Sequence, residues 1–261
     1  MRDLTYRPIV LSALTGFKLL GQRFDVQGTE HMPRSGGALI AYNHVGYLDF
    51  IYGGLAAHLA GRRLVRFMAK KEVFDHGIGG PVMRSMHHIP VDRGDGVASF
   101  HHAVEYLRAG ELVGIFPEAT ISRAMELKEF KSGAVRIAAE AGVPVVPVVL
   151  FGTQRIYTKD HPKDFSRGKT IAITVGAPFH PTGEDAAAET AELRRRMGIM
   201  LDETVSRYPA DERPAGAWWV PAKHGGSAPS LERAAEMDAE ELRARAARRA
   251  AKAAQRREQA G

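Results

Sequence analysis

The residues in this 261-residue sequence best suited to chemistry are a histidine and an aspartate in the segment NHVGYLD, residues 43–49. His44 and Asp49 do not share a face of a regular helix, because five steps of about 100° turn past the aligned position. They can meet if His44 lies in a turn and Asp49 begins the following helix. An Asp that accepts the proton-bearing nitrogen of a His fixes its tautomer, and the other ring nitrogen can then deprotonate a hydroxyl. Taken alone, the segment favours a simpler interpretation, a surface His and a helix-starting Asp, because the spacing is common by chance.

Three further segments follow predicted strands. The segment IPVDR, residues 89–93, brings Arg93 out at a strand end, where a guanidinium can bind a phosphate bidentately. The segment FPEATIS, residues 116–122, is also explained by a strand that stops at proline, with a hydroxyl capping a helix. The segment VPVVP, residues 143–147, is an apolar strand with a proline at each end.

In this order and spacing, the segments resemble the glycerolipid acyltransferase family, which includes the 1-acylglycerol-3-phosphate acyltransferases. The family pattern NHxxxxD is matched by Asn43, His44 and Asp49, and the Arg that ends its second block by Arg93. Its FPEGTRS block appears here as FPEATIS, and its fourth block is matched by residues 143–148. Residues 69–72 and 130–134 also match, so the resemblance covers about residues 25–180. Four ordered blocks are far more specific than any one of them.

The resemblance implies a role for each matched residue. His44 and Asp49 would be the catalytic pair, and Glu118 would orient the glycerol. Ala119 and Ile121 depart from the family pattern, which has Gly and Arg there; Arg123 is the candidate to replace the missing charge. The remaining expected substrate-binding residues are Asn43, Lys70, Arg93, Thr120 and Lys131.

The reaction implied is transfer of a fatty acyl chain from acyl-CoA or acyl carrier protein to a hydroxyl of a glycerol-phosphate lipid, most simply 1-acylglycerol-3-phosphate. His44 would act as general base and Asp49 would orient it, with no metal and no cofactor. Two alternatives stay open at this point. One is another acceptor, such as glycerol-3-phosphate, a glycolipid or a different lysolipid. The other is a non-catalytic protein that binds lipid or nucleic acid.

Alternating strand and helix patterns predict an α/β fold with a mixed, mostly parallel central sheet flanked by helices. The apolar runs and helical periodicities that support this prediction are strands at 38–42, 64–69, 89–91, 111–116, 143–151 and 169–175, and helices at 49–59, 77–86, 97–107, 131–141 and 184–207. An amphipathic helix is predicted at 8–20. It either packs on the core or lies in a lipid interface, and the resemblance implies that it caps a groove for the acyl chain.

The chain divides by composition into an acyltransferase domain at 1–208, with an interfacial N-terminal part at 1–24, and two C-terminal segments. Residues 209–230 are rich in Pro and Gly and predict a linker or a segment that wraps the surface. Residues 231–261 predict a helical tail rich in Ala and Arg.

Charge and composition narrow the classes of function. Seven Lys and Arg residues and no acid lie in 242–257, so the rest of the +6 chain sums to −1. A basic tail suits an anionic membrane surface, although a solvated helix explains it as well. The evenly charged body argues against a nucleic-acid partner. Cysteine is absent, which excludes a disulfide scaffold and a Cys nucleophile. Without a membrane span or signal peptide pattern, we expect a peripheral protein on the cytoplasmic side of the cell membrane.

Overall fold

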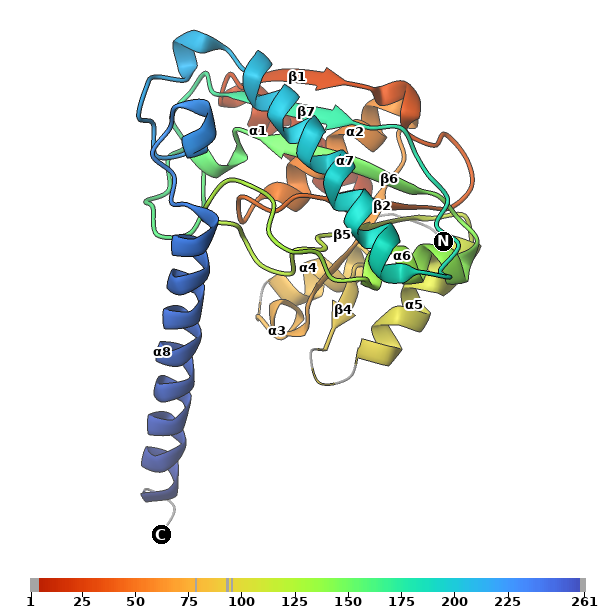
Figure 1. Ribbon diagram of the computed structural model, residues 1–261. Coiled ribbons are helices and arrows are strands. Elements are labelled where there is room, and N and C mark those ends of the chain that lie inside the picture. Colours follow the sequence, from red (N-terminus) through yellow and green to blue (C-terminus); the bar gives the residue numbers. More distant parts are fainter. Residues whose placement is uncertain (1–4, 78, 93, 95, 259–261) are drawn as a thin grey trace.

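The computed structural model describes residues 5–77, 79–92, 94 and 96–258. In that part of the chain, seven strands form one sheet in the order β1-β7-β6-β2-β5-β3-β4 (Figure 1). The strands are β1 Arg23–Gln27, β2 Ala38–Tyr42, β3 Val65–Lys70, β4 Ile89–Val91, β5 Leu112–Ile115, β6 Val145–Phe151 and β7 Thr170–Val175. The pairing of β6 with β7 is antiparallel and every other pairing is parallel, so β7 and β1 run against the other five strands.

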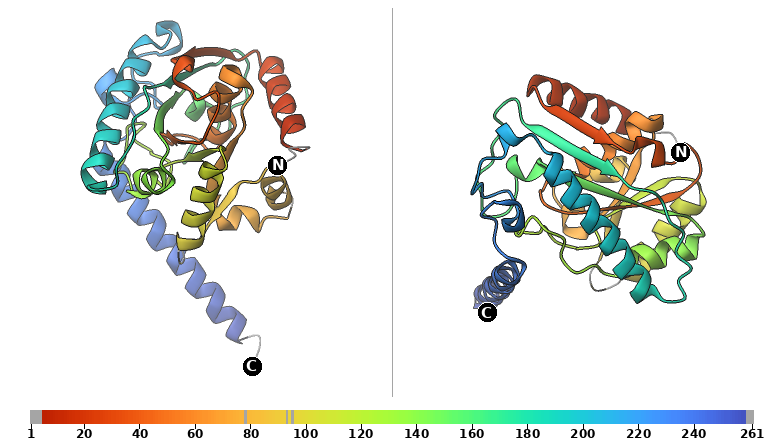
Figure 2. Two further views of the ribbon diagram at one scale, coloured as in Figure 1. Left: turned by 90° about the vertical axis from the view of Figure 1, so that its right-hand side faces the viewer. Right: turned by 45° about the horizontal axis from the view of Figure 1, so that its top comes forward.

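Helices cover both faces of the sheet (Figures 1 and 2). On one face lie α1 Tyr6–Leu19 and α2 Asp49–Gly61, and on the other lie α5 Gly96–Arg108, α6 Gly133–Ala141 and α7 Ala186–Arg207. The short helices α3 Lys71–Phe74 and α4 Gly79–Ser85 lie beyond the end of β3. Single 3₁₀ turns occur at Thr29–His31, Thr153–Arg155, Ala210–Glu212 and Ala222–His224, and the last helix is α8 Leu231–Glu258.

The sheet separates two hydrophobic cores, and the strand sequences show why. In β2, Ile40 and Tyr42 pack beneath α1 and α2, whereas Leu39 and Ala41 pack beneath α5, α6 and α7. Successive side chains of a strand point to opposite faces, so a strand with helices on both sides must be apolar at every position. All five residues of β2 and all seven of β6 are buried. The loops that begin at residues 43 and 152 therefore extend from strands that are packed on both faces.

The predicted α/β fold with a mostly parallel sheet is confirmed. The edge strand β1 was not predicted, because RFDVQ is only half-buried and has no apolar run. The helix predicted at 77–86 is present as Gly79–Ser85, and α3 comes before it as a separate turn. Among the described helices, none is both long and apolar enough to cross a bilayer.

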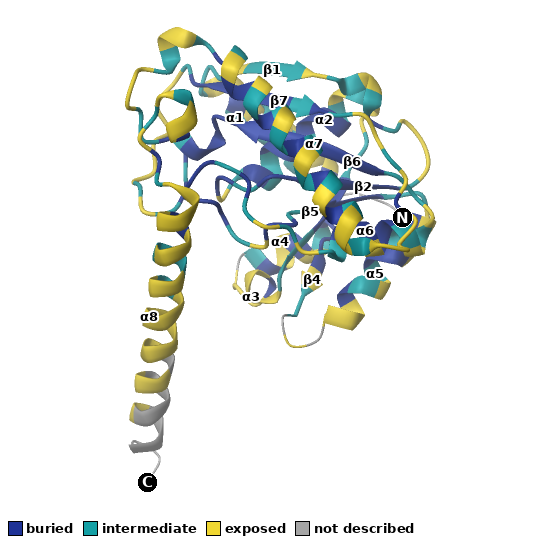
Figure 3. Cartoon of the chain, viewed as in Figure 1, coloured by how far each residue is buried: buried dark blue, intermediate teal, exposed yellow. Residues whose placement is uncertain are grey.

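Of the two interpretations of residues 209–230, the structure shows a segment that packs on the body. Trp219 and Val220 are buried, and the Trp219 ring lies 5.6 Å from Phe151 and 5.5 Å from Tyr208. Helix α8 follows and extends away from the body, most of its surface open to solvent (Figure 3). Among the described residues, Asp238 and Glu241, near the beginning of α8, form ion pairs with the body.

Candidate active site

The turn between β2 and α2 brings His44 and Asp49 together. The Nδ1 atom of His44 lies 2.9 Å from Oδ2 of Asp49, and the Asp49 side chain is fully buried whereas that of His44 is 21% exposed. With Nδ1 held by the carboxylate, Nε2 is the ring nitrogen that can accept a proton. The imidazole also stacks on Phe116, with ring centroids 4.3 Å apart. The pair therefore has the geometry of a general base and the residue that orients it.

Asp49 holds the turn as well as the imidazole. Its Oδ2 also accepts the main-chain N–H groups of Val45 at 2.7 Å and Gly46 at 2.8 Å. Its Oδ1 accepts the hydroxyl of Thr153 at 2.6 Å. Gly46 is closely surrounded, because a Cβ there would lie 3.2 Å from Oδ1 of Asp49 and 3.1 Å from the carbonyl oxygen of Tyr157. Four donors converge on one carboxylate, which compensates for the burial of its charge.

Glu118 braces the same turn from the FPEATIS segment. Its Oε1 accepts the main-chain N–H of His44 at 2.8 Å, and its Oε2 accepts that of Lys128 at 2.9 Å. The side chain is buried, and burial raises the pKa of Glu118 to about 8, although the two N–H donors act in the opposite direction. Both carboxyl oxygens thus face main-chain groups, so Glu118 shapes the turn that carries His44.

Asn43 ties the end of β2 to β6. Its side-chain amide donates to the carbonyl of Leu150 at 3.0 Å and its Oδ1 accepts the N–H of Leu150 at 2.7 Å. These two bonds reproduce the hydrogen bonds of a strand pair at the point where the chain leaves the sheet. Asn43 therefore fixes where the turn begins.

The next two predicted residues join a cluster of charges at the start of α8. Thr120 accepts a hydrogen bond from Nζ of Lys128 at 2.6 Å. Arg123 is 7% exposed and contacts Asp160, Asp238 and Glu241. The structure thus brings Arg123 together with carboxylates.

Three predicted phosphate ligands come from other elements. Lys131 precedes α6, its side chain is exposed, and its N–H donates to the carbonyl of Pro117 at 3.0 Å. Lys70 ends β3 and forms an ion pair with Glu72 at 2.7 Å. Arg93 lies outside the described residues; Lys70 is opposite Val91 in the sheet, two positions before it. Across the described part of the chain, no three His, Asp or Glu side chains gather as metal ligands.

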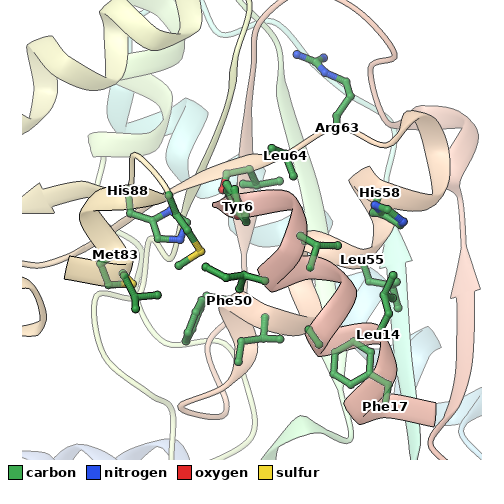
Figure 4. A pocket seen from close by; sticks show the side chains of 18 of the residues that line it. Tyr6, Leu14, Phe17, Phe50, Leu55, His58, Arg63, Leu64, Met83 and His88 are labelled. Atoms are coloured by element: carbon green, nitrogen blue, oxygen red, sulfur yellow. Dashed lines mark hydrogen bonds between the residues drawn. The ribbon is translucent and has the colours of Figure 1, made fainter. Parts of the chain in front are cut away.

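An apolar cavity of about 350 Å³ lies beneath α1 (Figure 4). Its walls come from α1, α2, α4 and the start of β3, and include Tyr6, Leu14, Phe50 and Met83. A row of aromatic rings runs from the wall of this cavity to His44. Phe50 follows Asp49 and lies 6.2 Å from Phe67, which lies 6.0 Å from Phe116, the ring on which His44 stacks.

Comparisons with known proteins identify the family of this chain. The family model described as Acyltransferase matches residues 23–151. The chain is 32% identical over 197 residues to a 1-acyl-sn-glycerol-3-phosphate acyltransferase of Bacillus subtilis, covering 72% of this chain and 90% of that one. It is 32% identical to the alpha form of that enzyme from Homo sapiens, covering 71% of this chain and 66% of the human one. The crystal structure of the 1-acyl-sn-glycerophosphate acyltransferase PlsC from Thermotoga maritima superposes with a TM-score of 0.62 at 23% identity, covering 77% of this chain and 80% of that one.

The fold is that of the solved PlsC structure, and the sequence matches acyltransferases over about 70% of the chain. The chain belongs to the glycerolipid acyltransferase family, and within it resembles the 1-acyl-sn-glycerol-3-phosphate acyltransferases. It is therefore an O-acyltransferase of phospholipid synthesis.

Three residues that hold this site were not found from the sequence. Thr153 follows β6 after Gly152, and a hydroxyl residue at a fourth strand end was an available signal. Lys128 and Asp238 gave no such signal, because their roles depend on contacts between residues 110 positions apart.

Proposed function

We propose that this enzyme transfers a fatty acyl chain from acyl-CoA or acyl carrier protein to the free hydroxyl of 1-acylglycerol-3-phosphate. The observation that carries the proposal is the 2.9 Å contact between His44 and the buried Asp49, at the end of a strand beside an apolar cavity. The similarity to enzymes named for this acceptor supports the choice of substrate.

The proton and the bonds move as follows. Nε2 of His44 takes the proton of the acceptor hydroxyl while that oxygen attacks the thioester carbonyl. Asp49 stabilises the imidazolium that forms, in the same way that it orients the neutral ring. The tetrahedral intermediate then collapses, the carbon–sulfur bond breaks, and the leaving thiolate takes the proton from His44. An ester and a free thiol are the products.

The oxyanion of the intermediate needs donors, and the hydrogen bonds of the turn show which are available. The N–H groups of residues 44–47 are used internally, by Glu118, by Asp49 and by the carbonyl of Tyr157. Within the described residues, no acceptor engages the N–H of Thr120 or Ile121. We therefore place the oxyanion against the 118–121 turn.

The phosphate of the acceptor needs cations that are open to solvent. Lys131 is exposed beside Pro117, and its position at the beginning of α6 adds the favourable N-terminal end of a helix. Arg93 is assigned the same role from the sequence pattern. Replacing Lys131 by methionine should raise KM for the acceptor about 10- to 100-fold, the value of one charge-assisted contact. KM for the donor should stay unchanged.

We assign the acyl chain to the cavity beneath α1, because that space is apolar and Phe50 in its wall begins a row of ring contacts, through Phe67 and Phe116, that ends at His44. Gly54 offers a direct test, since it lines the cavity and a Cβ there would meet nothing within 4 Å. Gly54→Phe should fill the space and shift donor preference to shorter chains. Gly198→Phe on α7 is the matched control, because its Cβ also meets nothing within 4 Å and it lies on the other face of the sheet.

The outer face of α1 is suited to a membrane surface. Leu11 is 63% exposed and Leu19 is 65% exposed, and Leu59 at the end of α2 is also exposed. Leu11 and Leu19 belong to the helix that covers the cavity, so insertion at this face would bring the cavity close to the lipid. We propose a peripheral location on the cytoplasmic leaflet, and the exposed leucines of α1 together with the basic end of α8 support it.

The decisive experiment offers purified enzyme glycerol-3-phosphate, 1-acylglycerol-3-phosphate and other lysolipids in parallel, with acyl-CoA or acyl carrier protein as donor. Phosphatidic acid should be the main product. The variant His44→Ala should fold normally and turn over about 10²- to 10⁴-fold more slowly, the usual contribution of a positioned base. Turnover close to wild type in a folded His44→Ala protein would exclude the mechanism.

A further inference from the structure

Helix α8 attaches to the body through a cluster of charges beside the catalytic turn. Three cations, Arg123, Lys128 and Lys159, come from the two loops that follow β5 and β6. Asp238 of α8 contacts all three, at 2.5 Å from Nζ of Lys128, at 2.9 Å from Nζ of Lys159, and in a short ion pair with Arg123. Glu241 adds contacts at 3.0 Å to Arg123 and 3.2 Å to Lys159. Asp238 therefore lies at the centre of the cluster.

Each of these cations lies at or next to a residue that holds the main chain of the catalytic turn. The N–H of Ser122, directly before Arg123, donates to the carbonyl of His44 at 2.8 Å. The N–H of Lys128 donates to Glu118, which accepts the N–H of His44. The hydroxyl of Thr158, directly before Lys159, donates to the carbonyl of Val45 at 2.6 Å.

An apolar contact joins the same parts of the molecule. Val45, next to His44, packs with Met125 of the loop between β5 and α6. It also packs with Ala228, which lies three residues before α8 begins. All three are nearly inaccessible to solvent. The C-terminal segment thus touches the catalytic turn directly as well as through the charges.

We propose that Asp238 is a positioning residue for acyl transfer. By holding the three cations together, it fixes the segments that brace the main chain of His44 and Val45. The proposal rests on the assignment of His44 as the catalytic base, and it concerns a residue far outside the motifs that define the family.

The burial of the cluster favours positioning over an exchangeable anion site. Arg123 is 7% exposed, so a guanidinium that lost its carboxylates would be left uncompensated inside the protein. Burial by itself would raise the pKa of Asp238, but hydrogen bonds from Lys128 and Lys159 outweigh it and the pKa is lowered. The carboxylate is thus held in its charged form by the cations that it joins.

The test uses the full chain with Asp238→Asn. We expect kcat to fall about 10- to 100-fold, because a displacement on the order of 1 Å in a catalytic group has an effect of that size. KM for donor and acceptor should stay near the wild-type values. Hydrogen exchange of the peptide that covers residues 43–49 should accelerate about tenfold, with exchange in α7 unchanged. Asp238→Glu, which keeps the charge, should restore part of the activity.

Two further variants separate positioning from a general loss of folding. Glu241→Gln should give a smaller loss, because Glu241 contacts two of the three cations. Glu240→Gln is the matched control on the same helix; Glu240 is exposed and pairs with Arg233 at 3.5 Å, away from the cluster. It should match the wild type in both measurements.

Several results would overturn the proposal. Wild-type kcat and exchange in a folded Asp238→Asn protein would show that α8 does not position the turn. A higher kcat would show that α8 restrains the enzyme instead, and a higher acceptor KM alone would make the cations phosphate ligands. Hydrogen exchange does not depend on the reaction. If the wild-type protein showed no acyl transfer, the proposed function would be refuted, and the exchange rates would still show whether Asp238 fixes the 43–49 turn.

Discussion

Replacing Thr153 with valine isolates one hydrogen bond to Asp49, the residue proposed to orient His44. Thr153 is fully buried, and its hydroxyl donates to Oδ1 of Asp49 at 2.6 Å. Valine has nearly the same shape, so the change removes the donor and leaves no cavity. A hydrogen bond to a charged group contributes about 1.5–3 kcal/mol, and we expect the free energy of unfolding to fall by that amount. Because Asp49 also orients His44, about 1.4 kcal/mol of the loss should reach the transition state, a tenfold fall in kcat.

A second buried threonine provides the control. Thr190 on α7 is also buried, and its hydroxyl donates at 2.5 Å to the carbonyl of Ala186, a neutral group. Thr190→Val should destabilise the protein by about 0.5–1.5 kcal/mol and leave kcat unchanged. Urea unfolding and steady-state kinetics on both variants measure the two quantities. If Thr153→Val kept wild-type kcat and lost no more stability than Thr190→Val, the hydrogen bond to Asp49 would have no catalytic role.

Three other changes test separate parts of the structure. Burial raises the pKa of Glu118 to about 8, so the native protein keeps a proton that the unfolded chain releases near pH 4.5. Through this group, the free energy of unfolding should therefore fall by several kcal/mol between about pH 4.5 and 8. Urea unfolding of Glu118→Gln should lack that fall, and parallel pH curves for the variant and the wild type would contradict the prediction. Ala119 has φ of 60°, in the left-handed region, where a side chain strains the backbone. Ala119→Gly should therefore raise the free energy of unfolding by up to about 1 kcal/mol. A lower melting temperature of the variant would show that Ala119 is not strained. Deleting residues 248–261 removes basic charge but keeps Asp238 and Glu241. Binding to anionic vesicles, measured by sedimentation, should weaken at low salt only, and activity on detergent-dispersed acceptor should be retained. Identical binding curves for the full and shortened chains would leave the tail without a membrane role.

The sequence predicted the class of fold because the core of this protein is simple. Strands buried on both faces are continuous apolar runs, as at 38–42 and 145–151, and the helices between them keep their periodicity. The edge strand β1 was not predicted, because an edge strand needs only one buried face and its hydrophobic pattern is weaker. The sequence also predicted that His44 and Asp49 can meet, because a turn between a strand and a helix allows the contact that the structure shows.

The rest of the site depends on contacts that no local pattern contains. Arg123 was predicted as a candidate for the charge of the family's missing arginine, and that role stays a prediction. In the structure its guanidinium contacts acidic residues, two of them from α8. A sequence gives the charge of such a residue but not its neighbours, because Arg123 and Asp238 are 115 positions apart. For the same reason, the tail was assessed by its seven basic residues, and the two acids that attach it were overlooked.

The attachment of α8 also has a consequence for how the enzyme is made. A growing chain leaves the ribosome with its N-terminus first, so residues 43–49 and most of the sheet emerge long before Asp238. Until then Arg123, Lys128 and Lys159 have no partner on α8, and the loops that carry them lack their last contacts. The support of the turn that carries His44 is therefore complete only after Asp238 and Glu241 have left the ribosome. Fragments that stop before residue 238, whether from interrupted translation or from proteolysis, would contain every motif of the family and still lack this support.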